Sequence, residues 1–132
     1  MSILRASIKK IENVENLNLV TFDFNGIDLK MVSLGLGKDV QVGKKVMLAI
    51  KPSSVAIAKE FSGEVSYTNK IHSTIIEVNN GKLLSSIKLQ ANGNNFESLI
   101  TFEVSYRMKL EVGDKVLALL KASELSISEI VS

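Results

Sequence analysis

The stretch "VGKKVMLAIKPSSVAIA" (42–58) decides the fold, because the chain repeats it seventy positions later as "VGDKVLALLKASELSIS" (112–128). Glycine, lysine and serine recur at the same places in both copies, for example Lys51 and Ser53 as Lys121 and Ser123. Self-similarity at a fixed period is typical of a duplicated structural unit. The 132 residues therefore predict two tandem units, 1–60 and 61–132.

The alignment continues upstream at a slightly shorter spacing. Gly26 in "DFNGID" matches Gly93 in "QANGNN" 67 residues later, so the second unit contains a net insertion of three residues. The inserted region includes "EVSYRMKLE" (103–111), for which we expect one or two helical turns. The segment "KEFSGEVSYTNK" (59–70) is expected to connect the two units.

Each unit has the sequence pattern of short β-strands. Leu4, Ala6 and Ile8 alternate with polar residues, as in a half-buried strand. Apolar runs flank Asn25-Gly26, a signal for a two-residue hairpin, and "VAIA" (55–58) is expected to close the first unit. The predicted fold is all-β, with two tandem OB-like five-stranded small barrels. Because a unit of about 60 residues is marginal on its own, we also expect a homo-oligomer.

Composition excludes several classes of chemistry. The chain has no cysteine and a single histidine, His72, so thiol catalysis, thiolate zinc and histidine-based metal sites are not expected. Its carboxylates are scattered, and neither GxxxxGK[ST] nor GxGxxG occurs. We therefore predict a protein that is not an enzyme, with no cofactor and no cation ligands.

Two further partner classes are not expected. The formal net charge is +2 and aromatic residues make up 5% of the chain, which is a weak basis for binding nucleic acid; Phe22 and Phe24 are expected in the core. No apolar run approaches the length of a membrane span, and "MSILRASIKK" is unlike a signal peptide. The expected location is the cytoplasm.

The recurring polar feature is a lysine followed by hydroxyl residues at a strand end, at Lys51–Ser53 and again at Lys121–Ser123. Further hydroxyls occur at 98–101 and at 66–69. Several hydrogen-bond donors converging with one ammonium group suit a small tetrahedral dianion, since charge-assisted hydrogen bonds are strong. The alternative is that these are ordinary turn residues, because turns favour Ser and Asn.

A family resemblance supports the first interpretation. The segments "SYTNKIHS" (66–73), "ESLIT" (97–101), "LEVGDKV" (110–116) and "KASEL" (121–125), with "KPSSV" (51–55) in the first unit, resemble the motifs of TOBE/Mop domains. The chain as a whole resembles two tandem domains of this type, as in a di-domain molbindin. The resemblance implies molybdate or tungstate as the ligand, bound at inter-domain interfaces of an oligomer. A trimer is favoured and a dimer is the alternative.

The resemblance also implies oxyanion-binding residues. They lie in an opening, a strand-end and a closing motif of the second unit, and in the closing motif of the first: Ser66, Tyr67, Thr68, Asn69, Ser98, Lys121, Ala122 and Ser123, then Lys51, Pro52 and Ser53. Lys30 is placed at the position of Ser98 in the first unit, where it could supply charge. We expect Ser98 and Lys121 to converge on one anion.

The sequence departs from the family pattern in three places. Thr68 replaces an arginine of the opening motif, Ser73 replaces its glycine, and the first unit lacks that motif. Pro52 also removes a backbone N–H that Ala122 retains.

The functional prediction is a cytoplasmic molybdate- or tungstate-binding protein for storage, buffering or delivery. Two alternatives stay open. One is the ligand-sensing effector module of a molybdate-responsive regulator or transporter. The other is an OB-type module that binds nucleic acid.

Overall fold

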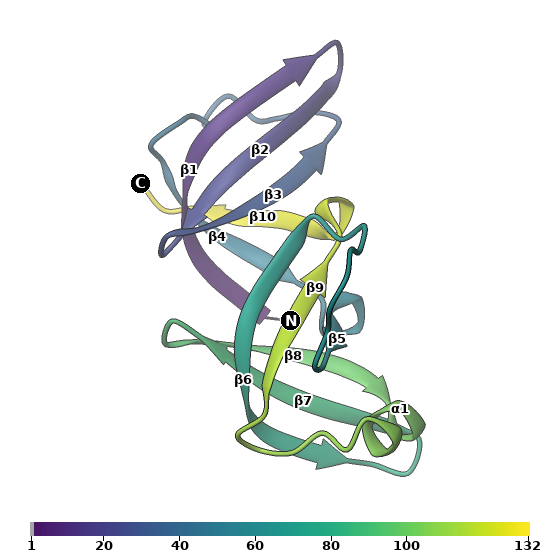
Figure 1. Cartoon of the computed structure of the whole chain (residues 1–132). Coiled ribbons are helices and arrows are strands. Elements are labelled where there is room, and N and C mark those ends of the chain that lie inside the picture. The colour runs from purple at the N-terminus through teal and green to yellow at the C-terminus, as the bar shows by residue number, and fades with distance from the viewer. Residues whose placement is uncertain (1) are drawn as a thin grey trace.

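The computed structural model describes residues 2–132 and shows two curled, five-stranded antiparallel sheets (Figure 1). The first sheet has the order β10-β4-β1-β2-β3 and consists of β1 (Ser2–Val14), β2 (Leu17–Phe24), β3 (Ile27–Ser33), β4 (Lys45–Ile50) and β10 (Leu125–Ile130). The second has the order β5-β9-β6-β7-β8 and consists of β5 (Ala56–Ala58), β6 (Asn69–Asn80), β7 (Leu84–Ala91), β8 (Asn94–Thr101) and β9 (Lys115–Leu120). The all-β prediction is confirmed.

The alternation of apolar and polar residues along the strands determines which side chains form the core. In β1, Leu4 and Ile8 are buried while Arg5 between them is exposed. Phe22 and Phe24 on β2 are fully buried, as expected. A single cluster of buried apolar side chains includes residues of both sheets, so the two halves share one core.

Two of the hairpins, β2–β3 and β7–β8, are closed by Asn-Gly pairs, as the sequence predicts. Asn25 and Gly26 have φ of 50° and 90°, and Asn92 and Gly93 have φ of 50° and 77°. A tight hairpin turn of this kind requires positive φ at both central residues, which Asn and Gly tolerate best. The matching turns give β2–β3 and β7–β8 the same register.

The insertion in the second unit forms a short helix, α1 (Phe102–Arg107). The hydroxyl of Thr101 accepts a hydrogen bond from the backbone N–H of Val104 at 3.3 Å and caps its start. The prediction of one or two helical turns in this region is confirmed.

The last strand of each half joins the sheet of the other half, which differs from the expectation that 55–58 closes the first unit. Strand β5 pairs with β9, with Ile57 opposite Ala118, and β10 pairs with β4, with Ile127 opposite Leu48. Two short 3-10 turns, η1 (Pro52–Ser54) and η2 (Ala122–Glu124), precede the exchanged strands. Alternation predicts which face of a strand is buried, but it carries no information on which of two similar sheet edges the strand joins.

The duplicated ranges 1–60 and 61–132 are consequently not the same division as the two sheets. Each sheet takes four strands from one range and its remaining strand from the other. This reciprocal exchange ties the halves together through backbone hydrogen bonds as well as through the core. No helix in residues 2–132 is long and apolar enough to cross a membrane.

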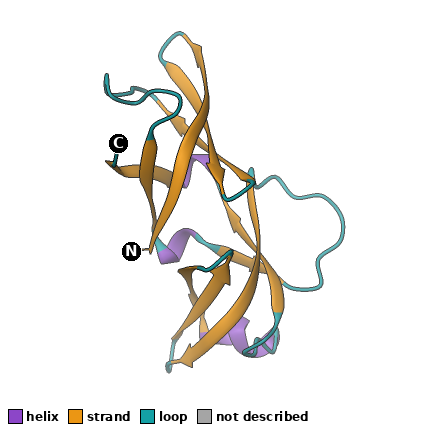
Figure 2. Cartoon of the chain, turned by 90° about the vertical axis from the view of Figure 1, so that its left-hand side faces the viewer, coloured by secondary structure: helices purple, strands orange, loops and turns teal. Residues whose placement is uncertain are grey.

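Lys59, the first residue of the connector, binds to the second half. The Lys59 ammonium group donates to the carbonyl oxygens of Met108 and Lys109 at 3.1 and 2.9 Å and lies 3.1 Å from the Asp114 carboxylate. The rest of the connector, up to β6, is a long loop that stands away from the sheets (Figure 2). The Lys59 contacts therefore fix the point at which the chain leaves the exchanged strand β5.

Asp114 makes stability depend on pH. A hydrogen bond from the Glu111 N–H and a second from Lys59 lower the pKa of the Asp114 carboxyl below its ordinary value of 3.8. A carboxyl group with a lowered folded-state pKa contributes stability above its unfolded pKa, and this contribution is lost as the pH falls through the folded pKa. We expect Asp114→Asn to lower the free energy of unfolding at pH 7, and to reduce its decline below about pH 4, in urea titrations.

The matched control is Asp39→Asn, which changes an exposed carboxylate with no ion-pair partner within residues 2–132. Identical pH profiles for the two variants would contradict the role assigned to Asp114.

Candidate functional site

The side chain of Asn69 joins the two halves at the start of β6. It is fully buried; its Nδ2 donates to the carbonyl oxygen of Lys30 at 2.9 Å, and its Oδ1 accepts from the N–H of Lys30 at 2.7 Å. In the ladder between β6 and β9, Asn69 lies opposite Leu120, the residue that precedes Lys121. The end of the opening motif, the second closing turn and strand β3 of the other half therefore meet at this point.

We call this place the Asn69 junction and define it by Lys30, Asn69, Lys121, Ala122 and Ser123. Turn η2 packs against β3 there. Lys121 and Ser123 are exposed, whereas Lys30 is half-buried. The first N–H groups of a short helical turn have no partner inside the turn, so they are available to a ligand.

An equivalent place, the Ser2 junction, comprises Ser2, Lys51, Pro52, Ser53 and Glu97. Ser2 lies opposite Ile50, and its hydroxyl accepts a hydrogen bond from the N–H of Glu97 at 3.0 Å. Turn η1 packs against β8 here, as η2 packs against β3 at the Asn69 junction.

The two closing turns also touch each other. The hydroxyl of Ser54 donates to the carboxylate of Glu124 at 3.1 Å. The two junctions are therefore connected directly, through residues that correspond in the repeat.

The lysines of both junctions have no carboxylate ion-pair partner among the described residues. Within residues 2–132, ion pairs join Lys9 to Asp28, Lys10 to Glu12, Lys59 to Asp114 and Lys88 to Glu77. None of these pairs includes Lys30, Lys51 or Lys121. An ammonium group without a carboxylate partner is available to bind an anion, whereas a paired one must first be released.

The structure divides the residues that the sequence singles out between the two junctions and the loop before β6. Ser66, Tyr67 and Thr68 lead into Asn69 and lie outside any strand; Ser66 and Thr68 are exposed and Tyr67 is half-buried. The second closing motif lies at the same junction, and the first lies at the Ser2 junction.

Ser98 lies at the first closing turn, and its convergence with Lys121 on one anion stays a prediction. Its side chain is fully buried, and its hydroxyl donates to the carbonyl oxygen of Val55 at 2.6 Å. The strand exchange explains this placement, because β8 packs against η1 while η2 packs against β3.

The expected match of Lys30 to Ser98 is wrong by one residue. Val20 lies opposite Met31, and the corresponding Ile87 lies opposite Ser98. Met31 is therefore the counterpart of Ser98. A shift of one residue moves a side chain to the other face of a sheet.

The same registers show that Lys30 is the counterpart of Glu97. Thr21 lies opposite Lys30, and the corresponding Lys88 lies opposite Glu97.

Sequence reasoning missed Ser2 and Glu97 as junction residues, and it missed the contact between Ser54 and Glu124 that connects the two closing turns. The signal was present in the repeat spacing, since 67 residues separate Ser2 from Asn69 and Lys30 from Glu97. Which residues of the two halves touch depends on the strand exchange, and the spacing does not contain that information.

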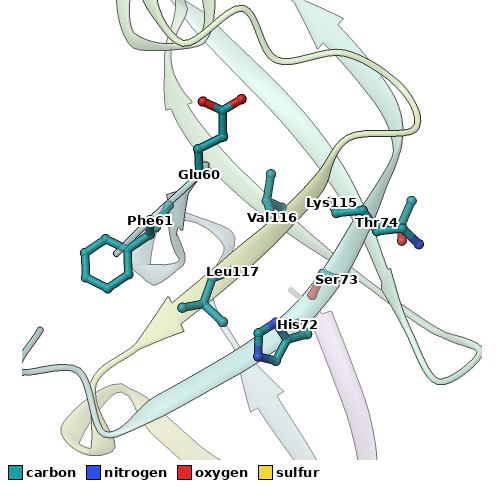
Figure 3. A pocket seen from close by; sticks show the side chains of 9 residues that line it. Glu60, Phe61, His72, Ser73, Thr74, Lys115, Val116 and Leu117 are labelled. Atoms are coloured by element: carbon teal, nitrogen blue, oxygen red, sulfur yellow. The ribbon is translucent and has the colours of Figure 1, made fainter. Parts of the chain in front are cut away.

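A groove of about 320 Å³ lies elsewhere, on β6 and β9 beside the end of β5 (Figure 3). Phe61, His72 and Leu117 are among the residues that line it. Of the residues assigned to the two junctions, none lines this groove. His72 is exposed there.

Comparison with known proteins identifies the fold. No model of a protein family matches the chain, and no curated protein matches it. Among solved structures, the cytoplasmic molybdate-binding protein ModG with molybdate bound is similar over 95% of this chain and 93% of its own, with a TM-score of 0.88 and 21% sequence identity. A molybdate-binding protein from Sporomusa ovata matches 51% of this chain over 100% of its own, with a TM-score of 0.49 and 30% identity.

The similarity to ModG extends over nearly the whole chain, so it includes both halves. It shows that the chain has the OB-like two-domain fold of that protein. The fold class predicted from the sequence is therefore confirmed.

The Ser98 hydroxyl is expected to stabilise the contact between the halves. Ser98→Ala leaves the carbonyl oxygen of Val55, a buried residue, without the donor it has at 2.6 Å. Losing a buried hydrogen bond in this way lowers the free energy of unfolding by about 1–3 kcal/mol. Urea denaturation measures the change.

Ser126→Ala is the control, because Ser126 lies exposed on β10. A loss of stability no larger for Ser98→Ala than for Ser126→Ala would show that the hydroxyl bond does not hold β8 to the segment that follows η1.

Proposed function

We propose that the protein binds molybdate or tungstate as a doubly charged oxyanion, without making or breaking a covalent bond. The observation that carries this proposal is the Asn69 junction, where a buried amide holds Lys30 beside the turn that bears Lys121 and Ser123. The likeness of the fold to a protein described as molybdate-binding supports the choice of ligand.

The donors at the Asn69 junction match the needs of a tetrahedral dianion. The Lys121 and Lys30 ammonium groups supply positive charge, and the Ser123 hydroxyl and the first N–H groups of η2 supply directional hydrogen bonds. A compact ammonium group on a flexible stem can adapt to an oxygen of a small anion without the planar geometry that arginine imposes.

Because the donor groups are distributed on an exposed turn, one chain alone leaves one side of the anion in water. Lys121, Ser123, Ser66 and Thr68 are all exposed in the single chain. A second copy packed over this face would exclude water and strengthen each charge-assisted bond, since electrostatic interactions grow as the dielectric constant falls. We therefore propose that the anion binds at an interface of a homo-oligomer, with a trimer favoured.

The proposed role is storage, buffering or delivery of the anion in the cytoplasm. Such a role needs reversible binding and selection by size and charge. Both follow from a fixed set of donors held at the proposed interface between folded chains.

Lys121→Ala is expected to weaken molybdate binding about ten- to hundredfold, because a charge-assisted hydrogen bond to a largely buried anion contributes roughly 1.5–3 kcal/mol. Isothermal titration of the assembled protein with molybdate and tungstate, with sulfate for comparison, measures the affinity. The matched control is Lys82→Ala, which removes an exposed lysine from a loop outside both junctions.

Two results would contradict the proposal at different levels. Equal affinities for the two variants would mean that Lys121 does not contact the anion. Absence of binding by the folded, unsubstituted protein to both molybdate and tungstate would remove the proposed function itself.

A further inference from the structure

The two junctions share a backbone framework but carry opposite charge at one equivalent position. Lys30 on β3 and Glu97 on β8 occupy the same place in the ladder relative to the Asn-Gly turns. Each is fixed by a side chain at the start of the other half's long strand, Lys30 by Asn69 and Glu97 by Ser2. The sequence thus places a lysine on β3, the strand against which η2 packs, and a glutamate on β8, the strand against which η1 packs.

The other charges near each junction do not reverse this difference. At the Asn69 junction, the Glu124 carboxylate accepts a hydrogen bond from Ser54 at 3.1 Å and is the acidic residue of the turn. This one negative charge is outnumbered by two ammonium groups, those of Lys30 and Lys121. Neither has an ion-pair partner within residues 2–132.

At the Ser2 junction, Ser2 accepts a hydrogen bond from the N–H of Glu97, and the Glu97 carboxylate accepts one from Ser86 at 3.0 Å. Lys88 lies opposite Glu97 in the ladder, but its ammonium group lies 3.4 Å from the Glu77 carboxylate. This cation is therefore already paired.

The closing turns also differ in the number of backbone N–H donors, and again the Asn69 junction is the more favourable one for an anion. Pro52 occupies the first position of η1 and has no backbone N–H, whereas Ala122 at the first position of η2 has one. Among residues 2–132, the Ser2 junction therefore offers one backbone donor fewer to an anion and one unpaired cation fewer.

We infer that the two junctions are not equivalent anion sites: the dianion binds at the Asn69 junction, and the Glu97 carboxylate excludes it from the Ser2 junction. This inference rests on the proposed function and specifies where that function resides. Like charges at close range repel by an amount that grows as water is excluded, so a carboxylate within reach of a bound dianion opposes binding. Residue 30 or 97 thus determines whether each junction accepts an anion.

Exchanging the charges tests the inference. Lys30→Glu is expected to weaken molybdate binding at least about tenfold, because it replaces an attracting charge with a repelling one. Glu97→Lys is expected to double the molybdate bound per chain at saturation. Both are measured by isothermal titration of the assembled protein, with thermal unfolding as a check that each variant folds.

Matched controls carry the same changes of net charge at exposed sites outside both junctions. Lys82→Glu reverses a lysine and Asp39→Lys reverses a carboxylate. Since long-range effects of net charge act on all variants alike, only the junction variants should change affinity or stoichiometry. If Glu97→Lys does not fold because Lys88 lies opposite, Glu97→Gln removes the repulsion alone and should add a second, weaker site.

The outcomes separate this inference from the proposed function. No molybdate binding by the unsubstituted protein would defeat the proposed function. Binding by that protein with the affinity unchanged in Lys30→Glu, or with stoichiometry unchanged in folded Glu97→Lys and Glu97→Gln, would leave the function standing and overturn the inference.

Discussion

The whole arrangement depends on the reciprocal pairing of β10 with β4 and of β5 with β9. These ladders carry the last strand of each half onto the edge of the other sheet, so each closing turn must cross between the halves. The crossing places η2 against β3 and η1 against β8. The bonds of Asn69 to Lys30 and of Ser2 to Glu97 join the two halves at the same places.

Duplication within one chain gives this arrangement a property that two separate identical chains would lack. The backbone of both junctions is set by the same turns and the same ladder registers, yet the side chains at corresponding positions are independent. Lys30 and Glu97, Asn69 and Ser2, and Ala122 and Pro52 are such pairs. A single fold can therefore present one surface suited to an anion and one that is unsuited to it.

Much of the fold can be predicted from the sequence because its signals are local. The Asn25-Gly26 and Asn92-Gly93 turns, the alternation of Leu4 to Ile8 and the helix that follows Thr101 each depend on neighbouring residues. The choice of the sheet edge that β5 joins has no such local signal. The strands β4 and β9 are similar in sequence and both are apolar, so their edges look alike. Only the packing of the whole chain selects between them.

The candidate site is predicted less completely for the same reason. The closing motifs and Asn69 are recognisable in the sequence. However, Asn69 bonds to Lys30 and Ser2 bonds to Glu97, and in each case the partner comes from the opposite half. The assignment of Lys30 to the position of Ser98 failed by one residue, which in a strand is enough to exchange an outward side chain for a buried one.

The most direct test is the location of anomalous scattering from molybdenum in crystals of the protein grown with molybdate. The account predicts a peak at the Asn69 junction, within hydrogen-bond distance of the Lys121 ammonium group and the Ser123 hydroxyl. An ordered molybdenum peak found only elsewhere, such as in the groove beside Phe61 and His72, would contradict it.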